Sequence, residues 1–194
     1  MTRSPSFSSS RRRLLAVAGL AVLGGCASPA RILSGEQSAL LNRTGRFAVS
    51  VDYSGGKQEA VQGGFAWQDT GRQLTLDLAN PMGTTLARVT VQPGSALLVR
   101  ADGSQQSAPS ADALIEQVLG SPMPVGGLRY WLRGEAAPQG VSHAQRDPQG
   151  RFTYFEQNGW LVQLSRYDAQ GPLLLRMNRN ESQRSISVRL VVDA

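Results

Sequence analysis

The chain has 194 residues, of which 20 are Lys or Arg and 14 are Asp or Glu, and it contains one cysteine and one histidine. Four of the 20 basic residues and none of the acidic ones precede Cys26, so the remainder carries 16 basic against 14 acidic side chains, a net charge of +2. This near balance argues against nucleic-acid binding, and a lone cysteine excludes disulfides within the chain.

The N-terminal segment has the pattern of a bacterial lipoprotein signal peptide. Three consecutive arginines precede an apolar run over residues 14–23, which is too short to span a bilayer. The run ends in two glycines followed by Cys26, and small residues at this point are what a signal peptidase requires. We therefore expect residues 1–25 to be a signal peptide, Cys26 to be lipidated, and residues 26–34 to form a lipidated tether.

Ala27 indicates which membrane holds the anchor. In the lipoprotein class an Asp after the lipidated cysteine marks retention in the inner membrane, so Ala27 implies export to the outer membrane. Two or more acyl chains give stable attachment where one gives only marginal binding. We expect the chain to be held at the periplasmic face of the outer membrane through Cys26.

Residues 35–194 are long enough to form one domain with its own core. Ser34 and Gln37 have the spacing of a capping box and predict a short helix that carries Ala39, Leu40 and Leu41 and ends before Gly45. From Arg46 the hydrophobic period changes to two, which predicts a half-buried strand through Tyr53. Further strands are predicted through Phe65 and Trp67 and at residues 74–78, 86–91, 96–100, 152–155, 160–167, 173–177 and 186–192.

Two helices are predicted between the two groups of strands. Ser110 can cap a segment whose apolar residues fall on one stripe up to Leu119, before Gly120 and Pro122. A second short helix carrying Leu128, Trp131 and Leu132 ends at Gly134. The predicted fold class is mainly β with α, an incomplete, unclosed antiparallel β-barrel covered by two or three short helices. A flat two-sided sandwich is the alternative, but it offers the helices no apolar surface to cover.

Residues suited to catalysis or metal binding are sparse. His143 lies in a polar stretch over residues 141–148 that reads as a loop, and no second histidine or free cysteine can join it as a metal ligand. The chain has no nucleophile elbow and no glycine-rich phosphate loop. We interpret Glu135 and Asp147 as charged surface residues in loops. We predict no catalytic residue, no metal site and no cofactor, while hydrolysis by paired carboxylates stays open.

The large apolar residues of the early strands can form either a core or a binding site. Phe65 and Trp67, together with Leu74, Leu76 and Leu78, are predicted to share the inner face of the sheet. The pattern alone favours a hydrophobic core, and only a cavity would turn that core into a binding site.

Several short motifs occur in one order between Arg46 and the C-terminus, and together they resemble the LolB family of outer-membrane lipoprotein-insertion proteins. The motifs are Asn80-Pro81-Met82-Gly83-Thr84-Thr85, Gln92-Pro93-Gly94, Met123-Pro124-Val125 and Leu128-Arg129-Tyr130-Trp131-Leu132-Arg133-Gly134, with Phe47-Ala48-Val49, Phe65-Ala66-Trp67-Gln68 and Asn158-Gly159-Trp160. The resemblance implies an incomplete barrel of the LolA/LolB kind, with an apolar cavity for acyl chains.

The resemblance also implies a function. A LolB-like protein accepts acylated lipoprotein cargo from the periplasmic carrier LolA and inserts it into outer-membrane lipid, without ATP and without enzymatic catalysis, and we expect it to be a monomer. The family's exposed apolar loop residue falls on Met82, flanked by Pro81 and Gly83, where leucine is more usual. A Met82 side chain folded back onto its own sheet is the alternative. The residues expected to line the acyl-chain cavity are Phe47, Val49, Phe65, Trp67, Leu74, Leu76, Leu78, Leu114, Ile115 and Trp131.

Two other functions remain open from the sequence. A lipid-anchored envelope hydrolase requires a convergent polar cluster in a cleft, for example carboxylates gathered around His143. A structural outer-membrane lipoprotein requires a filled core and a large flat apolar patch.

Overall fold

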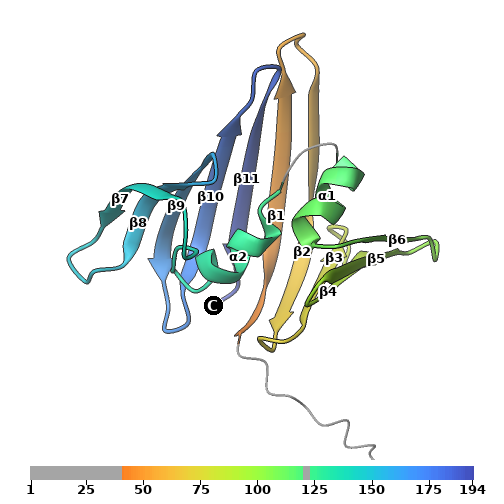
Figure 1. The fold of residues 1–194 in the computed structure, drawn as a ribbon, viewed down its shortest axis with the longest axis horizontal. Coiled ribbons are helices and arrows are strands. Elements are labelled where there is room, and N and C mark those ends of the chain that lie inside the picture. The colour runs from red at the N-terminus through yellow and green to blue at the C-terminus, as the bar shows by residue number, and fades with distance from the viewer. Residues whose placement is uncertain (1–40, 120–122) are drawn as a thin grey trace, which may run out of the picture. The chain divides into compact units, whose positions relative to one another are not determined.

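The structure, a computed structural model, describes residues 41–119 and 123–194, in which eleven strands form one antiparallel sheet accompanied by two helices (Figure 1). The strands are β1 (Leu41–Tyr53), β2 (Gln58–Asp69), β3 (Leu74–Ala79), β4 (Thr85–Gln92), β5 (Ser95–Arg100), β6 (Gln105–Ala108), β7 (Val141–Arg146), β8 (Phe152–Gln157), β9 (Trp160–Tyr167), β10 (Pro172–Asn180) and β11 (Arg184–Val192). The helices are α1 (Ala111–Leu119) and α2 (Val125–Trp131). Neither of these two described helices has the length and apolar character needed to cross a membrane.

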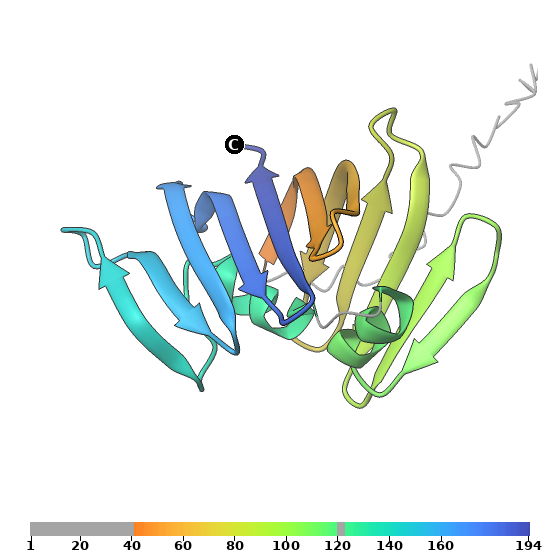
Figure 2. The same cartoon turned by 90° about the horizontal axis from the view of Figure 1, so that it is seen from above.

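The sheet consists of two meanders joined at the middle. Its strand order is β6-β5-β4-β3-β2-β1-β11-β10-β9-β8-β7. Within β1–β6 and within β7–β11 each strand pairs with its neighbours in sequence, and β1 pairs with β11 to join the two meanders. The two outermost strands, β6 and β7, do not pair with each other, which leaves the barrel open. The sheet is curved and both helices lie inside the curve (Figure 2). The predicted unclosed antiparallel barrel with covering helices is therefore confirmed.

The alternation of side chains gives the sheet one apolar face and one polar face. On β1 the apolar side chains lie opposite apolar residues of β11, namely Phe47 opposite Leu190, Val49 opposite Val188 and Val51 opposite Ile186. The residues between them, Ala48 and Ser50, point to the polar face. Trp67 of β2 lies opposite Leu76 of β3 on the apolar face, as predicted. Each large side chain fully buried there stabilises the fold by about 1.5–3 kcal/mol.

The two helices begin with different kinds of N-cap. At α1 the hydroxyl of Ser110 accepts a hydrogen bond from the backbone N–H of Ala113 at 3.2 Å, which confirms the predicted cap. At α2 the N-cap residue is Pro124, which makes no side-chain capping hydrogen bond. Asp112 of α1 supplies the missing acceptor, because its Oδ1 lies 2.8 Å from the backbone nitrogen of Gly126. The start of α2 is thus fixed to α1.

Three sequence expectations differ from the structure. Leu41, predicted to lie in a helix that ends before Gly45, is the first residue of β1 and lies opposite Asp69. Residues 141–146, predicted as a loop, form the edge strand β7, with a register shift beside His143 and a φ of 50° at that residue. Strand β6 was not predicted. Both edge strands carry mainly polar, exposed side chains, so they lack the alternation that marks a half-buried strand. The predictions for Cys26 and residues 1–40 lie outside the described residues.

Candidate functional site

Part of the apolar face remains accessible at the centre of the sheet. We call Phe47, Val49, Val51, Val61 and Leu78 the open apolar strip. Val49 lies directly opposite Val61 of β2 on one side and Val188 of β11 on the other. Val61 is 52% exposed, and the other four strip residues are half-buried. An apolar side chain at the middle of a sheet is normally covered, so this strip is a surface suited to an apolar ligand.

The residues predicted to line an acyl-chain cavity share the apolar face and its covering helices, but they differ in accessibility. Five are buried in the core, namely Phe65, Trp67, Leu74, Leu114 and Trp131. Five are half-buried and pack against that core, namely Phe47, Val49, Leu76, Leu78 and Ile115. Only the second group presents surface to a ligand without rearrangement.

Two pockets of this structure are lined mainly by residues of the opposite, polar face. One of about 480 Å³ is lined by Ala48, Ser50 and Gln62, whose side chains point away from the apolar face, and also by Val49 and Val61. A second of about 460 Å³ is lined in part by Tyr154 and Gln163. The candidate site is therefore the open apolar strip itself. The first pocket shares Val49 and Val61 with the strip, and the second shares no residue with it.

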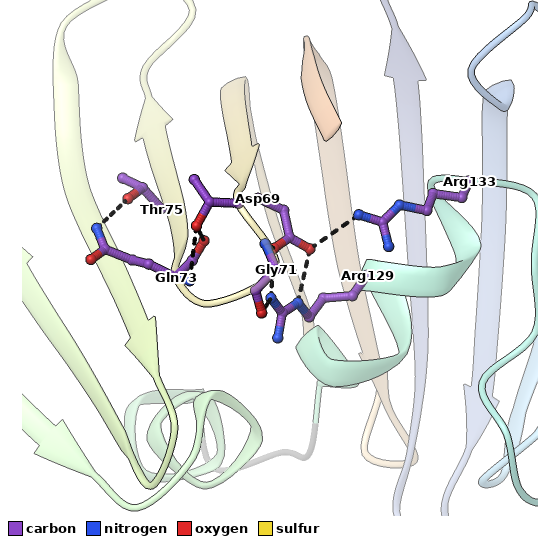
Figure 3. Close-up of polar contacts among 7 residues, drawn as sticks. Asp69, Gly71, Gln73, Thr75, Arg129 and Arg133 are labelled. Carbon is purple, nitrogen blue, oxygen red and sulfur yellow. Dashed lines mark hydrogen bonds and ion pairs between the residues drawn. The ribbon is translucent and has the colours of Figure 1, made fainter. Parts of the chain in front are cut away.

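Asp69 joins the end of β2 to helix α2 (Figure 3). Its side chain is 1% exposed, and it accepts hydrogen bonds from Arg129 Nε at 2.9 Å and from Arg129 Nη2. The backbone N–H of Gly71 donates a third at 2.8 Å, and Arg133 Nη2 lies 3.6 Å away. Burial disfavours the ionised carboxyl, but these hydrogen bonds and the two arginine charges outweigh it and lower the pKa of Asp69.

Gln157 fixes the other end of α2. Its side chain is 1% exposed, and its Oε1 accepts hydrogen bonds from Trp131 Nε1 at 2.8 Å and from the backbone N–H of Ala137 at 3.1 Å. Its Nε2 donates to the carbonyls of Ala137 at 2.8 Å and Gln139 at 2.6 Å. Sequence reasoning missed both Asp69 and Gln157 as positions that place α2 over the apolar face.

The connection between β3 and β4 is a hydrogen-bonded turn with an exposed apolar tip. Asn80 Oδ1 accepts hydrogen bonds from the backbone N–H groups of Met82 at 2.9 Å and Thr84 at 3.0 Å. Gly83 adopts a φ of +87°, a conformation that favours glycine, and its N–H donates to the Asn80 carbonyl. Met82 is 94% exposed, so it does not fold back onto its sheet. The exposed Pro81 precedes it.

The surroundings of His143 do not form the cluster that a hydrolase would need. His143 is 71% exposed and its Nδ1 lies 3.1 Å from Glu156 Oε2. The Tyr154 hydroxyl donates to the other oxygen of Glu156, and this hydrogen bond lowers the pKa of that carboxyl. Among the described residues, one carboxylate, that of Glu156, lies within ion-pair distance of His143. Across residues 41–119 and 123–194 no three His, Cys, Asp or Glu side chains are grouped to hold a metal ion.

Comparison with known proteins identifies the family of this fold. The family model described as "Outer membrane lipoprotein LolB" matches residues 41–194. Three relatives named "Outer-membrane lipoprotein LolB" align over most of both chains. The relative from Bordetella pertussis is 55% identical, and the alignment covers 89% of this chain and 87% of the relative. The relative from Bordetella petrii is 51% identical over 93% of this chain and 92% of the relative. The relative from Cupriavidus necator is 39% identical over 95% of this chain and 96% of the relative. The chain belongs to the LolB family.

Proposed function

We propose that this chain is an acceptor anchored in the outer membrane, which receives acylated lipoproteins from the periplasmic carrier LolA and inserts them into the outer membrane. It catalyses no covalent reaction and uses no ATP. The observation that carries the proposal is the open apolar strip on the helix-covered face of an unclosed barrel. The family membership and the names of the relatives, which are outer-membrane lipoproteins, support it.

The proposed domain organisation follows the sequence. Residues 1–25 are a signal peptide, residues 26–34 are a tether lipidated at Cys26, and residues 35–194 form a single lipoprotein-binding domain that acts as a monomer. Anchoring through Cys26 would keep the domain close to the membrane that receives its cargo. Cys26 positions the protein and does not contribute to the binding surface.

The energetics of acyl chains explain why such an acceptor is needed. Burying an acyl chain stabilises it by about 0.8 kcal/mol per CH₂, so a chain of roughly sixteen carbons left in water costs on the order of 10 kcal/mol. Without ATP, cargo has to move down a gradient of affinity from carrier to acceptor to bilayer. An open strip suits such a transfer, because a chain lying on it can leave sideways without the barrel having to unfold.

Two groups of residues have distinct proposed roles. The half-buried Phe47, Val49, Leu76, Leu78 and Ile115 contact the acyl chains, while the buried Phe65, Trp67, Leu74, Leu114 and Trp131 shape the surface beneath them. The turn of Pro81, Met82 and Gly83 enters the bilayer and guides release. Met82 suits that role because its side chain is apolar, flexible and almost fully exposed.

A transfer experiment tests the proposal. A lipoprotein bound to LolA is mixed with the full-length chain in the absence of ATP, and the distribution of cargo between the two proteins is measured after separation. Liposomes are added in a second step, and membrane-associated cargo is quantified. We expect cargo to move first to this chain and then to the liposomes. Cargo that stays on LolA in the presence of excess acceptor would refute the proposal.

A further inference from the structure

Two buried hydrogen-bond donors lie side by side on the apolar face with no acceptor among the described residues. Arg43 of β1 and Trp67 of β2 are directly opposite each other, so their side chains emerge from the same face of the sheet. Arg43 is 4% exposed and Trp67 is 1% exposed. The unpaired groups are Arg43 Nε–H and Trp67 Nε1–H.

The rest of the Arg43 side chain is held in place. Its Nη1 and Nη2 donate to the two carboxylate oxygens of Asp168 at 2.6 and 2.8 Å. Asp168 Oδ1 in turn accepts the backbone N–H groups of Gln170 and Gly171, each at 2.8 Å. The guanidinium plane is therefore fixed, and the Nε–H cannot rotate to find another acceptor. Because Asp168 already balances the charge, a partner for Nε–H has no need to be an anion.

The unpaired state of Trp67 is not general for buried indoles in this fold. Trp131 is also fully buried, and its Nε1–H is bonded to Gln157. A buried donor without an acceptor is destabilising, and the sheet contains two of them at adjacent positions. An oxygen acceptor attached to an apolar group would pair with these donors and remain compatible with the leucines around them, Leu41 and Leu76.

We propose that Arg43 and Trp67 form a polar subsite that accepts the carbonyl oxygen of an acyl ester or amide. This inference rests on the proposed function, since acylated cysteines carry such carbonyls at the head of each chain. From Arg43 the apolar face continues along β1 to Phe47 and Val49 in the open apolar strip. The seven residues from Arg43 to Val49 span about 20 Å of strand, which is comparable to the length of a long acyl chain.

Entry to the subsite requires α2 to shift. Asp69 lies two residues beyond Trp67 on β2 with its side chain on the same face, and Arg129 of α2 is bonded to it. The helix therefore meets the sheet beside the two donors. An acyl group reaches them when α2 moves aside. Its carbonyl oxygen then lies between the sheet and the helix and accepts the hydrogen bonds of the two donors, which a hydrocarbon in the same place could not do.

The test compares two lipopeptides that differ only in the linkage of their chains. One carries two ester-linked acyl chains on its cysteine adduct, and the other carries the matching ether-linked chains, which lack the carbonyls. Binding to the full-length chain is measured for both. The informative variant is Trp67→benzothienylalanine, which replaces the indole N–H by sulfur at nearly constant shape. The same replacement at Trp131 is the matched control, because that N–H is already bonded to Gln157.

We expect the unmodified chain to bind the ester about three- to tenfold more tightly than the ether, which is the worth of one hydrogen bond to an otherwise unpaired donor. Trp67→benzothienylalanine should reduce this ratio by weakening binding of the ester, whereas the Trp131 control should preserve the ratio. Arg43→Lys, which keeps a positive charge beside Asp168 but removes Nε–H, should reduce the ratio as well.

Other outcomes separate this inference from the proposed function. If the unmodified chain binds both lipopeptides equally, or if the Trp67 variant retains the ratio, the subsite is refuted and the proposed function stands. A parallel loss of affinity for both ligands in the Trp67 variant would assign the N–H a structural role and also refute the subsite. If the unmodified chain binds neither lipopeptide, the proposed function itself fails.

Discussion

Arg129 of α2 and Asp69 at the end of β2 are sixty residues apart in the chain and form a two-point ion pair, through Arg129 Nε at 2.9 Å and Nη2. Arg129 Nη2 also donates to the carbonyl of Gly71 at 3.2 Å, and this short helix has further polar attachments at both of its ends. Asp112 holds its first turn through the N–H of Gly126, and Gln157 holds its last residue, Trp131. The position of α2 over the apolar face is thus set by directional bonds as well as by apolar packing.

Loss of the Asp69 charge should destabilise the fold. Asp69→Asn leaves Arg129 without an ionic partner in a half-buried position, and we expect a loss of about 2 kcal/mol in the free energy of unfolding, between the values for buried and exposed pairs. Asp77→Asn is the matched control, because its partner Arg88 is 59% exposed and the exposed pair should contribute less than about 1 kcal/mol. Urea unfolding measures both. Equal losses in the two variants would contradict a special role for Asp69.

Acid should weaken the fold through Asp168 and Asp69. The hydrogen bonds from Arg43 lower the pKa of Asp168, and those from Arg129 lower the pKa of Asp69 against the effect of burial. A lowered pKa in the folded state stabilises the protein fully above the ordinary aspartate pKa of about 3.9. That stability is lost as the pH falls through the lowered folded-state values.

Urea unfolding at several pH values tests this. We expect the free energy of unfolding to decline below about pH 4. Asp168→Asn should be less stable at neutral pH, and its stability should fall less steeply in acid, because one linked proton has been removed. If the variant and the unmodified chain show the same slope below pH 4, Asp168 does not contribute to the acid sensitivity.

The sequence predicted those strands whose side chains alternate in polarity. Strands β3 and β11 each alternate, so spacing alone places Leu76 and Leu78 on one face of β3, and Ile186, Val188 and Leu190 on one face of β11. Strand β7 could not be found this way. Its six residues are all exposed, and the strand pairs with β8 through backbone hydrogen bonds. Its side chains therefore do not alternate between buried and exposed, which is the pattern that marks a strand in a sequence.

The polar positions of the apolar face were only partly visible in the sequence. Asp69 is in phase with Trp67 and Gln157 is in phase with Phe155, so both could have been recognised as inward-facing polar residues in need of partners. Their partners could not have been assigned. Asp168 is 125 residues from Arg43, and a pairing over such a separation follows from the strand order, which side-chain spacing does not encode.

Removing the Gln157 side chain should cost more than removing an exposed glutamine. Gln157→Ala leaves the Trp131 N–H and the backbone groups of Ala137 without partners in a buried position, and we expect a loss of about 3 kcal/mol in the free energy of unfolding. Gln163→Ala, on the exposed polar face of β9, should change stability by no more than about 0.5 kcal/mol. A loss at Gln157 no larger than that at Gln163 would show that water replaces these bonds at little cost.

The open apolar strip can be tested with two adjacent residues that face opposite ways. Val61→Glu places a carboxylate on the strip at a side chain that is already 52% exposed, so the fold should tolerate it. Cargo affinity should fall at least about tenfold, because an acyl chain on the strip would cover the charge. Ala60→Glu adds the same charge on the polar face and should leave affinity unchanged. Equal affinities in the two variants would exclude the strip as the acyl-chain surface.

The exposed Met82 separates cargo acceptance from membrane insertion. Met82→Glu should leave stability within about 0.5 kcal/mol of the unmodified chain, because a 94% exposed side chain makes few contacts. Acceptance of cargo from LolA should also be unchanged, since the turn lies at the tip of the β3–β4 connection and outside the strip. Insertion of cargo into liposomes should fall, because a carboxylate at the tip opposes entry into the bilayer interior. Met82→Leu, which keeps the tip apolar, should insert cargo normally. If Met82→Glu inserts cargo as fast as Met82→Leu, the tip takes no part in release, and cargo must leave the strip without contact between this turn and the membrane.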